Sequence, residues 1–386
     1  MNVNQLQEID NQHIMSTYSR RPLLIEKGKG CYVFDETGKK YLDFVSGIAT
    51  CSVGHANPTV VRAITEQAKK LISVSNLYYT EPPIQLALTL SRLSGLKKVF
   101  FCHSGTEANE AAIKLAKKVT GKSEFIAFTE AFHGRTTGSL ALTHNEKYRQ
   151  PFLPLAPTVR FAQYNNAESL ESLVSDNIAA VIVEPIEGEA GVIVPDEGFL
   201  TAVRQICDRH KILMIVDEVQ TGLGRTGNFF AYQAEGIRPD IVTIAKGLAN
   251  GLPIGACLSD YSLDIGEHGS TLGGNSLSTA AALATIGYIE KHRLIDNAAK
   301  TGTYLMKRLA CLSKQGSILE AVRGKGLMIG VTLKRPIANQ IVAGCQNAGL
   351  LCNAPTPNVI RLLPPLIVKR QQADECVEIL TKELQP

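Results

Sequence analysis

The chain has 386 residues, of which 45% are hydrophobic, so it can bury a large core that most simply divides into two domains. Forty lysines and arginines stand against 36 aspartates and glutamates, which leaves a net charge of +4. This excess is too small to indicate a nucleic-acid partner, and no run of basic residues contradicts that exclusion.

The cysteines and the apolar stretches indicate a cytoplasmic protein without a membrane partner. Nine cysteines are scattered along the chain without a Cys-x-x-Cys pair, which is typical of reduced thiols and not of a disulfide frame or a metal site. The N-terminus has no apolar core behind a basic start, so we expect no signal or transit peptide. The stretch from Ala280 to Ile289 is too short to cross a bilayer, which takes ~20 residues.

The first 52 residues are expected to form one part of a small domain. Two short alternating segments, Cys31 to Phe34 and Tyr41 to Phe44, predict strands, and Thr37-Gly38 predicts the hairpin turn between them. From residue 53 to residue 275, apolar runs alternate with helical patterns. That alternation predicts an α/β domain with a mostly parallel sheet.

A strand, a turn and a helix are predicted near residue 100. The run Val99 to Cys102 leads into Ser104-Gly105-Thr106 and then an alanine-rich segment, Glu110 to Val119. Ser104 or Thr106 can cap the helix, Gly105 allows a close approach of the backbone, and the free amides of the first turn can bind an anion. Taken alone, these three residues indicate a helix cap more than a phosphate site.

A further predicted strand, Phe125 to Phe128, leads to Phe132-His-Gly-Arg135. Phe132 offers an aromatic face for a planar ring, and Arg135 offers a guanidinium for a carboxylate. Taken alone, Phe132 is more typical of a core residue than of a stacking partner.

Three apolar runs end in polar residues, at Glu184, Asp217 and Lys246. Open parallel sheets bind ligands beyond the carboxyl ends of their strands, so these side chains are expected to lie close together. A lysine and an aspartate so placed suit a covalently held pyridoxal phosphate. The lysine forms a Schiff base with the aldehyde, and the carboxylate pairs with the pyridine nitrogen. The alternative is that each run is an ordinary strand followed by a solvated charge. That alternative would explain any one of the runs, but it explains the three runs together less well.

A rival motif stands between Gly222 and Gly227, where Gly-Leu-Gly-Arg-Thr-Gly satisfies the pattern of dinucleotide-binding dehydrogenases. In those enzymes the glycines join a strand directly to a helix whose N-terminus meets the pyrophosphate. Here the residues from Asp217 to Thr221 intervene, and Asn228-Phe229-Phe230 opens no helix cap. The motif therefore favours a dehydrogenase only weakly.

The C-terminal part, residues 276 to 386, is expected to complete the small domain. It contains a long helical stretch from Leu277 to Leu312, a strand from Met328 to Leu333 and a final helix from Gln371 to Leu384.

These segments together resemble the class III, or ω-amino acid, aminotransferases from about Tyr18 to Leu366. The matching pieces are Gly28-Lys29-Gly30 with Asp43-Phe44, Gly54-His-Ala-Asn-Pro58, Ser104-Gly-Thr-Glu-Ala-Asn109, Phe132-His-Gly-Arg135, Glu184-Pro-Ile-Glu-Gly-Glu189, Asp217-Glu-Val-Gln220, Lys246-Gly247, His268-Gly-Ser-Thr271 with Gly273-Gly-Asn275, and Arg361-Leu-Leu-Pro-Pro-Leu366. The resemblance implies the α/β fold of type I pyridoxal-phosphate enzymes, with a small α+β domain built from both chain ends.

The resemblance also implies roles for individual residues. Lys246 would form the Schiff base and carry protons, and Asp217 would pair with the ring nitrogen. The other implied cofactor-binding residues are Ser104, Gly105 and Thr106 at the phosphate, Phe132 on the ring face, Val219, Gln220 at the ring hydroxyl, and Thr271, which would reach the phosphate of the neighbouring subunit. That last role implies a homodimer with shared sites, and no metal is implied.

Within the family, the likeness is strongest to members that use acetylated ornithine. The implied reaction moves the terminal amino group of N2-acetylornithine to 2-oxoglutarate, a step of arginine biosynthesis. The implied substrate-binding residues are Tyr18, Arg135 and Ser270 for the donor, Arg361 for the α-carboxylate of 2-oxoglutarate, and Glu189 as the partner of Arg361 when no carboxylate is bound. Ornithine, succinylornithine, succinyldiaminopimelate and carrier-bound lysine stay open as donors, as does a catalytically silent binding protein on this fold.

Ile48 stands where ornithine-specific members carry a tyrosine that receives the free α-amino end. An apolar wall there would leave an ammonium group partly unpaired, so an acylated donor is expected to be preferred. Alternatively, Ile48 packs in the core and selectivity lies elsewhere.

Several positions depart from the common sequence pattern of the family. Glu187 replaces a glutamine, Ala190 a glycine, Leu272 an aromatic residue and Ser276 a proline. Glu187 adds a negative charge near Glu189 that would weaken the binding of a dicarboxylate, unless the side chain points to solvent. A harmless position at the surface is the favoured interpretation.

Overall fold

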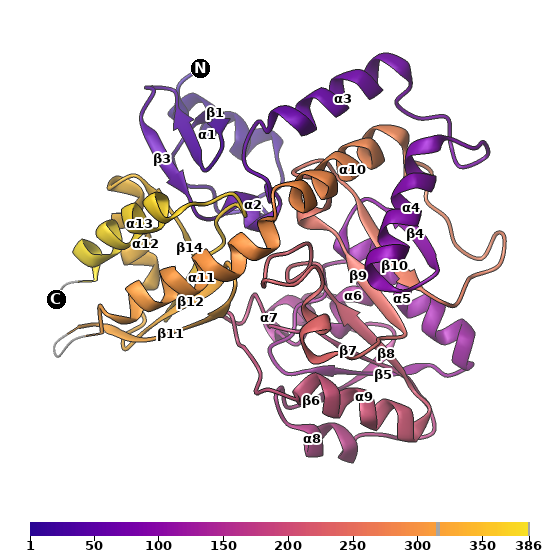
Figure 1. Cartoon of the computed structure of the whole chain (residues 1–386). Helices are drawn as coiled ribbons and strands as arrows, with labels where there is room; N and C mark the ends of the chain where they lie inside the picture. Colours follow the sequence, from indigo (N-terminus) through magenta and orange to yellow (C-terminus); the bar gives the residue numbers. More distant parts are fainter. Residues whose placement is uncertain (314–316, 385–386) are drawn as a thin grey trace.

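The computed structural model describes residues 1–313 and 317–384 and contains three sheets with the helices that cover them (Figure 1). The largest sheet has seven strands. In spatial order these are β4 (Lys98–Cys102), β10 (Gly255–Ser259), β9 (Ile241–Ile244), β8 (Leu213–Asp217), β7 (Ile178–Val183), β5 (Glu124–Phe128) and β6 (Thr158–Ala162). The strands from β9 to β6 are parallel to one another, which confirms the mostly parallel sheet.

Strand β10 is the exception, because it runs antiparallel to both β9 and β4. The segment between β9 and β10 holds only a short 3-10 helix, η3 (Lys246–Ala249). A parallel return needs a longer crossover connection. The reversal therefore follows from the short connection.

Side chains of the central strands alternate between two apolar layers, as the two-residue period of a strand requires. On β8, Met214 and Val216 face one layer, and Leu213 and Ile215 face the other. The second layer is covered by α5 (Gly105–Thr120), whose alanines allow a close approach to the sheet. The first is covered by further helices. These are α3 (Pro58–Lys70), α4 (Glu81–Ser94), α9 (Phe199–His210) and α10 (Ser276–Lys291).

The remaining elements of the large lobe are short. They are α6 (Thr137–Leu142), α7 (Glu146–Arg149), η1 (Gln150–Phe152), α8 (Ala167–Ser172) and η2 (Ala231–Glu235).

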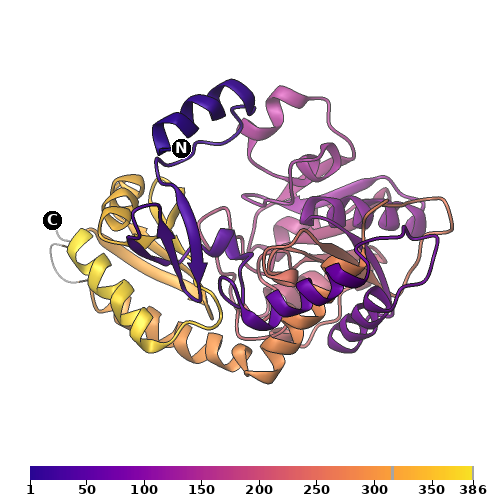
Figure 2. The same ribbon diagram turned by 90° about the horizontal axis from the view of Figure 1, so that it is seen from above.

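Two four-stranded sheets form the smaller lobe. One has β1 (Ile25–Lys29), β2 (Tyr32–Asp35), β3 (Lys40–Asp43) and β13 (Leu350–Leu351), and the other has β11 (Leu319–Lys325), β12 (Met328–Leu333), β15 (Val359–Leu362) and β14 (Asn353–Thr356). Because β3 from the N-terminal part pairs with β13 from the C-terminal part, both chain ends lie in this lobe (Figure 2). The predicted hairpin between β2 and β3 is present, with Gly38 at φ 84°.

Helices α11 (Leu294–Ala310), α12 (Ala338–Asn347) and α13 (Arg370–Glu383) cover the smaller lobe, and α1 (Val3–His13) and α2 (Ser46–Ala49) belong to the N-terminal part. The predicted helical stretch from Leu277 to Leu312 is two helices, α10 and α11. They are separated at Arg293, which has φ 51°. The predicted strand at 328–333 and the final helix are both present.

The domain boundaries after residues 52 and 275 stay a prediction. Helix α10, the first element after the second boundary, packs against α3 and α4 of the large lobe. The predicted small domain ends at residue 386, which lies outside the described residues. Over the described residues, no helix combines the length and apolar character that crossing a membrane requires.

Candidate active site

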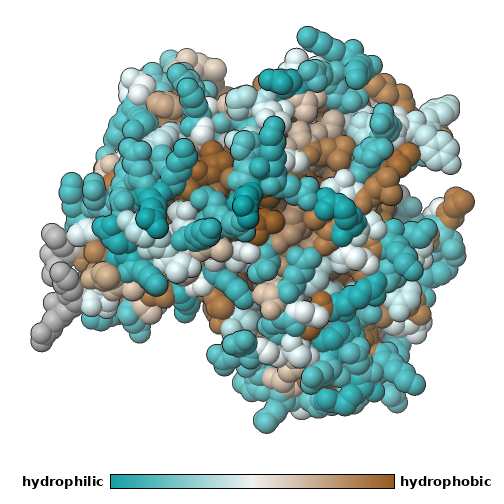
Figure 3. Space-filling view, viewed as in Figure 1, coloured by the Kyte–Doolittle hydropathy of each residue, from teal (hydrophilic) through white to brown (hydrophobic). Residues whose placement is uncertain are grey.

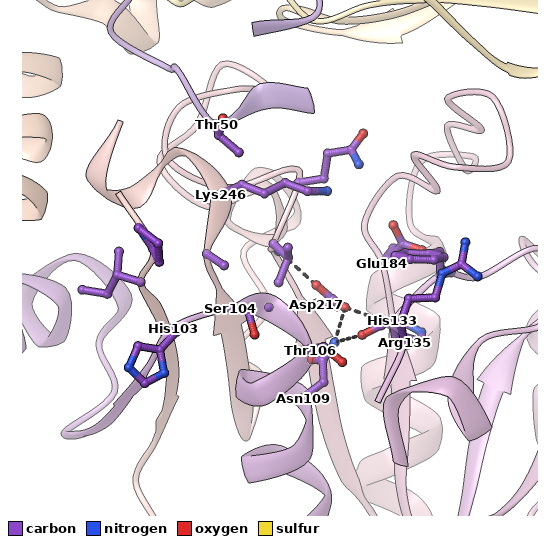
Figure 4. Close-up of a pocket in the computed structure, with 18 of the residues that line it drawn as sticks. Thr50, His103, Ser104, Thr106, Asn109, His133, Arg135, Glu184, Asp217 and Lys246 are labelled. Carbon is purple, nitrogen blue, oxygen red and sulfur yellow. Dashed lines mark hydrogen bonds and ion pairs between the residues drawn. The ribbon is translucent and has the colours of Figure 1, made fainter. Parts of the chain in front are cut away.

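A cavity of about 380 Å³ lies beyond the carboxyl ends of β7, β8 and β9 (Figure 4). Its size is in the range of sites for small ligands and cofactors. Most of the residues expected at a cofactor line it. These are Ser104, Gly105, Thr106, Phe132, Asp217, Val219, Gln220 and Lys246, and Arg135, expected at the substrate, lines it too. Strand order explains the convergence, because β9, β8 and β7 are neighbours and all end at this edge.

The N-terminus of α5 forms one wall. Ser104 is the N-cap, and its hydroxyl accepts from the Glu107 amide at 3.3 Å, so Ser104 and not Thr106 caps the helix. A Cβ atom on Gly105 would lie 2.7 Å from Cγ1 of Val219, so only glycine permits this contact. The free amides of the first turn and the helix dipole suit a phosphate group here.

Asp217 is held in a fixed orientation by three hydrogen bonds. Its Oδ2 accepts from Nδ2 of Asn109 at 2.8 Å and lies 2.8 Å from Nδ1 of His133. Its Oδ1 accepts from the Val219 amide at 3.0 Å. The carboxylate is almost fully buried, so these bonds decide where its remaining lone pairs point.

Asn109 and His133 are functional residues that no sequence pattern predicted, although both stand in the segments that resemble the family. Asn109 also donates to the His133 carbonyl at 2.7 Å and accepts from the Thr243 hydroxyl at 2.7 Å, which fixes its amide. The available signal was the helical spacing, since Asn109 lies on the same helix as the capping Ser104. These residues support Asp217, much as outer-shell groups orient a ligand.

Lys246 follows β9 and has φ 40°, a left-handed conformation that is uncommon for a residue with a side chain. Its side chain extends into the cavity (Figure 4). Burial lowers the pKa of the Lys246 amine, and the charge of Arg361 adds to this effect, while the nearby carboxylates, of which Glu189 acts most strongly, oppose it. A lowered pKa increases the fraction of neutral amine, which is the nucleophilic form.

Arg361, on β15, is buried. Its Nη1 donates to Oε1 of Glu189 at 2.7 Å, to the Gly188 carbonyl at 3.0 Å and to Oε1 of Gln220 at 3.2 Å. Burial is the largest effect on Glu189 and raises its pKa, but the charges of Arg361 and Lys246 and the hydrogen bonds from Arg361 and Gln220 together lower it, and the net shift is downward. Glu189, which is partly exposed, and the buried Arg361 thus form an ion pair that ties the loop after β7 to the smaller lobe.

Glu184 ends β7 and lines the cavity. Its Oε1 accepts from the Phe132 amide at 2.9 Å, and its Oε2 accepts from the Gly188 amide at 3.4 Å. Burial raises the pKa of Glu184 to about 7. Phe132 is partly buried and lines the cavity, so it is not simply a core residue.

The other wall is closed by a network that sequence reasoning missed. The Oε1 atom of Glu110 accepts from the Thr136 hydroxyl at 2.6 Å and from the Gly138 amide at 2.8 Å. Thr136 in turn bonds Thr106 through their hydroxyls at 2.7 Å. This network fixes the segment that follows Arg135, whose guanidinium lies 3.5 Å over the Tyr148 ring.

Six residues predicted to serve the substrate or a partner do not line the cavity: Glu189 and Arg361, described above, and four others. Tyr18 and Thr271 are exposed, Ser270 lies in the loop before α10, and Ile48 is 41% exposed with φ 60°. The alternative that Ile48 packs in the core is therefore wrong.

The favoured interpretation of Glu187 is also wrong, because its side chain is fully buried and does not reach solvent. The cause is a backbone bridge in which the Glu187 amide and carbonyl bond Ile193 at 3.1 and 3.0 Å. This bridge turns the side chain inward.

The glycines from Gly222 to Gly227 form turns, and the next helix, η2, begins only at Ala231. Within this segment the buried Arg225 donates to the carbonyls of Leu327 and Pro364. These bonds join the segment to the smaller lobe. The glycines therefore serve a contact between the two lobes, and no dinucleotide is needed to explain them.

Comparisons with known proteins agree over nearly the whole chain. Residues 14–384 match the family described as aminotransferase class III. An acetylornithine aminotransferase of Archaeoglobus fulgidus is 48% identical over 377 residues, which cover 97% of this chain and 98% of that protein. One from Gloeobacter violaceus is 45% identical over 385 residues, with coverage of 97% and 96%.

Solved structures of two kinds share the fold. An ornithine aminotransferase of Toxoplasma gondii, with pyridoxal phosphate partly occupying its active site, has a TM-score of 0.95 at 29% identity, with coverage of 99% of this chain and 94% of that one. An acetylornithine aminotransferase of Elizabethkingia anophelis has a TM-score of 0.89 at 33% identity, with coverage of 100% and 99%.

Proposed function

The chain belongs to the class III aminotransferases, and on that premise we propose that it transfers the terminal amino group of N2-acetylornithine to 2-oxoglutarate with pyridoxal phosphate as cofactor. The products are N-acetylglutamate 5-semialdehyde and glutamate, and the reaction is a step of arginine biosynthesis. The names of the relatives at 42–48% identity support this donor.

One observation carries the proposal: the Lys246 side chain enters a cavity that also holds the oriented carboxylate of Asp217 and the N-terminus of α5. These are the three groups that an aldehyde, a pyridine nitrogen and a phosphate require. When bound, the cofactor supplies a protonated ring that withdraws electrons from the donor carbon that loses its proton.

Each protein residue then has a defined task. The Lys246 amine would hold the cofactor covalently, and after the donor has displaced it the free amine would accept the proton that the donor's δ-carbon loses. Asp217 would keep the ring nitrogen protonated, Phe132 would lie against the ring, and Gln220, beside Val219, would bond the ring hydroxyl. Ser104, Gly105 and Thr106 would bind the phosphate.

Arg361 and Glu189 provide for two substrates in one site. We assign Arg361 to the α-carboxylate of 2-oxoglutarate, since a guanidinium binds a carboxylate through two parallel bonds. Before that substrate arrives, Glu189 neutralises Arg361 through the ion pair at 2.7 Å. Arg135, Ser270 and Tyr18 are proposed to hold the acylated end of the donor.

The decisive experiment compares kcat/KM for N2-acetylornithine and ornithine at the same 2-oxoglutarate concentration. A preference of roughly 30- to 1000-fold for the acetylated donor is expected, equivalent to about 2–4 kcal/mol of unpaired ammonium. Succinylornithine, succinyldiaminopimelate and carrier-bound lysine complete the panel. An Ile48→Tyr variant with an unchanged ratio would remove Ile48 from the explanation.

Ornithine is the second candidate donor, because an ornithine aminotransferase has a TM-score of 0.95 with this chain. Equal kcat/KM values, or a preference for ornithine, would establish that alternative.

We further propose a homodimer with shared sites. Two loops project from the same edge of the large lobe, one after α3 and one before α10, and Nδ2 of Asn76 joins them by donating to the carbonyls of Ser270 and Gly273, each at 3.0 Å (Figure 1). Leu77, Tyr79 and Leu272 on these loops are 84%, 96% and 53% exposed. Figure 3 shows apolar surface gathered around α10 and along these loops, which is the kind of surface that a second copy covers.

The cytoplasm is the proposed location, supported by nine cysteines that are all free thiols. A large domain at 53–275, with 1–52 and 276–386 as parts of a small one, is the proposed domain division, supported by the joining of β3 and β13.

A further inference from the structure

The carboxyl group of Glu187 is enclosed without a hydrogen-bond partner. Its side chain has no exposed surface, and neither Oε1 nor Oε2 has a partner among the described residues. The bridge to Ile193 fixes the backbone on both sides of the side chain. An ionised carboxylate in such a place would lose its hydration and gain no bond in return.

The groups around Glu187 also oppose a negative charge. Glu184 at the end of β7 and Glu130 after β5 both act on it as negative charges, and no cation among the described residues offsets them. Just after β6, the hydroxyl of Tyr164 donates to the carbonyls of Glu184 and Pro185, at 3.0 and 3.1 Å. Burial, and then Glu184 and Glu130, raise the pKa of Glu187 to about 10.

The loop that carries Glu187 also carries the partners of Arg361. The next residues, Gly188 and Glu189, accept from Nη1 of Arg361 at 3.0 and 2.7 Å. A Cβ atom on Gly188 would lie 2.4 Å from Oε1 of Gln220, so the loop is closely packed on the cavity side. The Glu187 side chain therefore cannot turn toward water unless the neighbouring partners of Arg361 move.

We propose that Glu187 is a positioning residue, buried as a neutral carboxylic acid, whose loss of a proton displaces the loop that orients Arg361. A glutamine at this position could not lose such a proton, so the pH response depends on the carboxyl group itself. The role of Arg361 in binding 2-oxoglutarate rests on the proposed function, whereas the buried acid does not.

The sign of the pH effect follows from the two states of the carboxyl. In the unfolded chain it releases its proton near pH ~4.3, and in the folded chain only near pH 10. Between these values unfolding releases a proton, so a rise in pH destabilises the folded protein. The stability contribution of His55 also changes with pH, because Asp43 and then Cys51 raise the pKa of His55 to about 10. This contribution is the same in every variant of Glu187, so it cancels when the variants are compared.

The test measures melting temperatures of the cofactor-loaded enzyme from pH 5.5 to pH 9. Glu187→Gln keeps the size of the side chain without the proton, and Glu187→Met is a second neutral variant of similar length. Glu197→Gln is the matched control, because Glu197 is exposed and follows the same loop. We expect Glu187→Gln to melt a few degrees above the unsubstituted enzyme at pH 9, with the difference shrinking toward pH 5.5, and Glu197→Gln to show no such trend.

The link to Arg361 is tested by KM. In the unsubstituted enzyme and in Glu197→Gln, KM for 2-oxoglutarate should rise severalfold between pH 8 and pH 10.5, because the folded carboxyl loses its proton only near pH 10, whereas KM for the amino donor should not follow it. In Glu187→Gln that rise should disappear. If the difference in melting temperature between each neutral variant and the unsubstituted enzyme does not change with pH, Glu187 is not a buried neutral acid. A rise in KM that persists in Glu187→Gln overturns the coupling to Arg361. The melting experiment needs no turnover, so a failure of the proposed function is recognised separately.

Discussion

At Lys246, desolvation acts on the amine more strongly than any single charged neighbour does. The lowered pKa lets one side chain serve first as the nucleophile and then as a proton carrier, because both tasks need the neutral amine. Glu189 and Arg361 oppose each other in their effects on this amine, so the ion pair between them limits the net field at Lys246.

Lys246→Ala is expected to fold and to lose turnover by a factor of more than about 1,000, or ~4 kcal/mol of transition-state stabilisation. The cofactor should still bind, because the contacts of α5, Phe132 and Asp217 remain. Steady-state rates and the absorbance of bound cofactor check the two halves of this prediction. Retained steady turnover would sink the assignment of Lys246.

Asp217→Asn is expected to reduce kcat by at least about tenfold, because a neutral amide no longer favours a protonated ring nitrogen and each pKa unit is worth about 1.4 kcal/mol. Glu218→Gln is the matched control, since Glu218 is also buried and adjacent but does not line the cavity. It should change the melting temperature more than kcat. Equal kcat in Asp217→Asn and the unsubstituted enzyme would refute the role of Asp217.

At the scale of elements, the start of α5 and the segment after β8 define the cofactor cavity together. Gly105 lets them meet, and Val219 both fills the contact and donates its amide to Asp217 at 3.0 Å. A change in the distance between these segments therefore affects the phosphate end and the ring end of the site at once.

Gly105→Ala is expected to weaken cofactor binding by about tenfold, or ~1.4 kcal/mol, because the added Cβ would lie 2.7 Å from Val219. Titration of cofactor-free enzyme with pyridoxal phosphate measures the change. The double variant with Val219→Ala should recover part of the affinity, since it removes the colliding methyl groups. An unchanged affinity in the single variant contradicts the proposed contact.

At the scale of the whole molecule, the two projecting loops leave large apolar side chains uncovered, and Thr271 stands among them. A symmetric dimer covers such a surface on both copies at once. In the proposed homodimer, Thr271 of each copy would lie at the edge of the other's site.

Mixing inactive Lys246→Ala with inactive Thr271→Asp subunits is expected to restore activity. In a heterodimer, one of the two sites then has both native residues. The control mixture pairs Lys246→Ala with a subunit that carries both substitutions, which leaves no native site. Complete absence of recovery, with heterodimers demonstrated by mass, would count against shared sites.

The elements of the large lobe could be predicted because their signals are local. The runs before Glu184, at Asp217 and before Lys246 are strands β7, β8 and β9. The Ser-Gly-Thr segment is the start of helix α5. Hydrophobic period and cap residues act over a few positions, so the sequence alone is sufficient for them. The direction of β10 follows from the length of one connection.

The sequence by itself determined which strands exist, that their polar ends meet at one edge, and which lysine and aspartate stand there. Only the tertiary structure decided which side chains support them and which are enclosed. Asn109 and His133 meet Asp217 across long sequence separations, and Glu187 is buried because the bridge to Ile193 turns it inward. The physical reason is that hydration of a side chain depends on the segments packed over it, which local pattern does not contain.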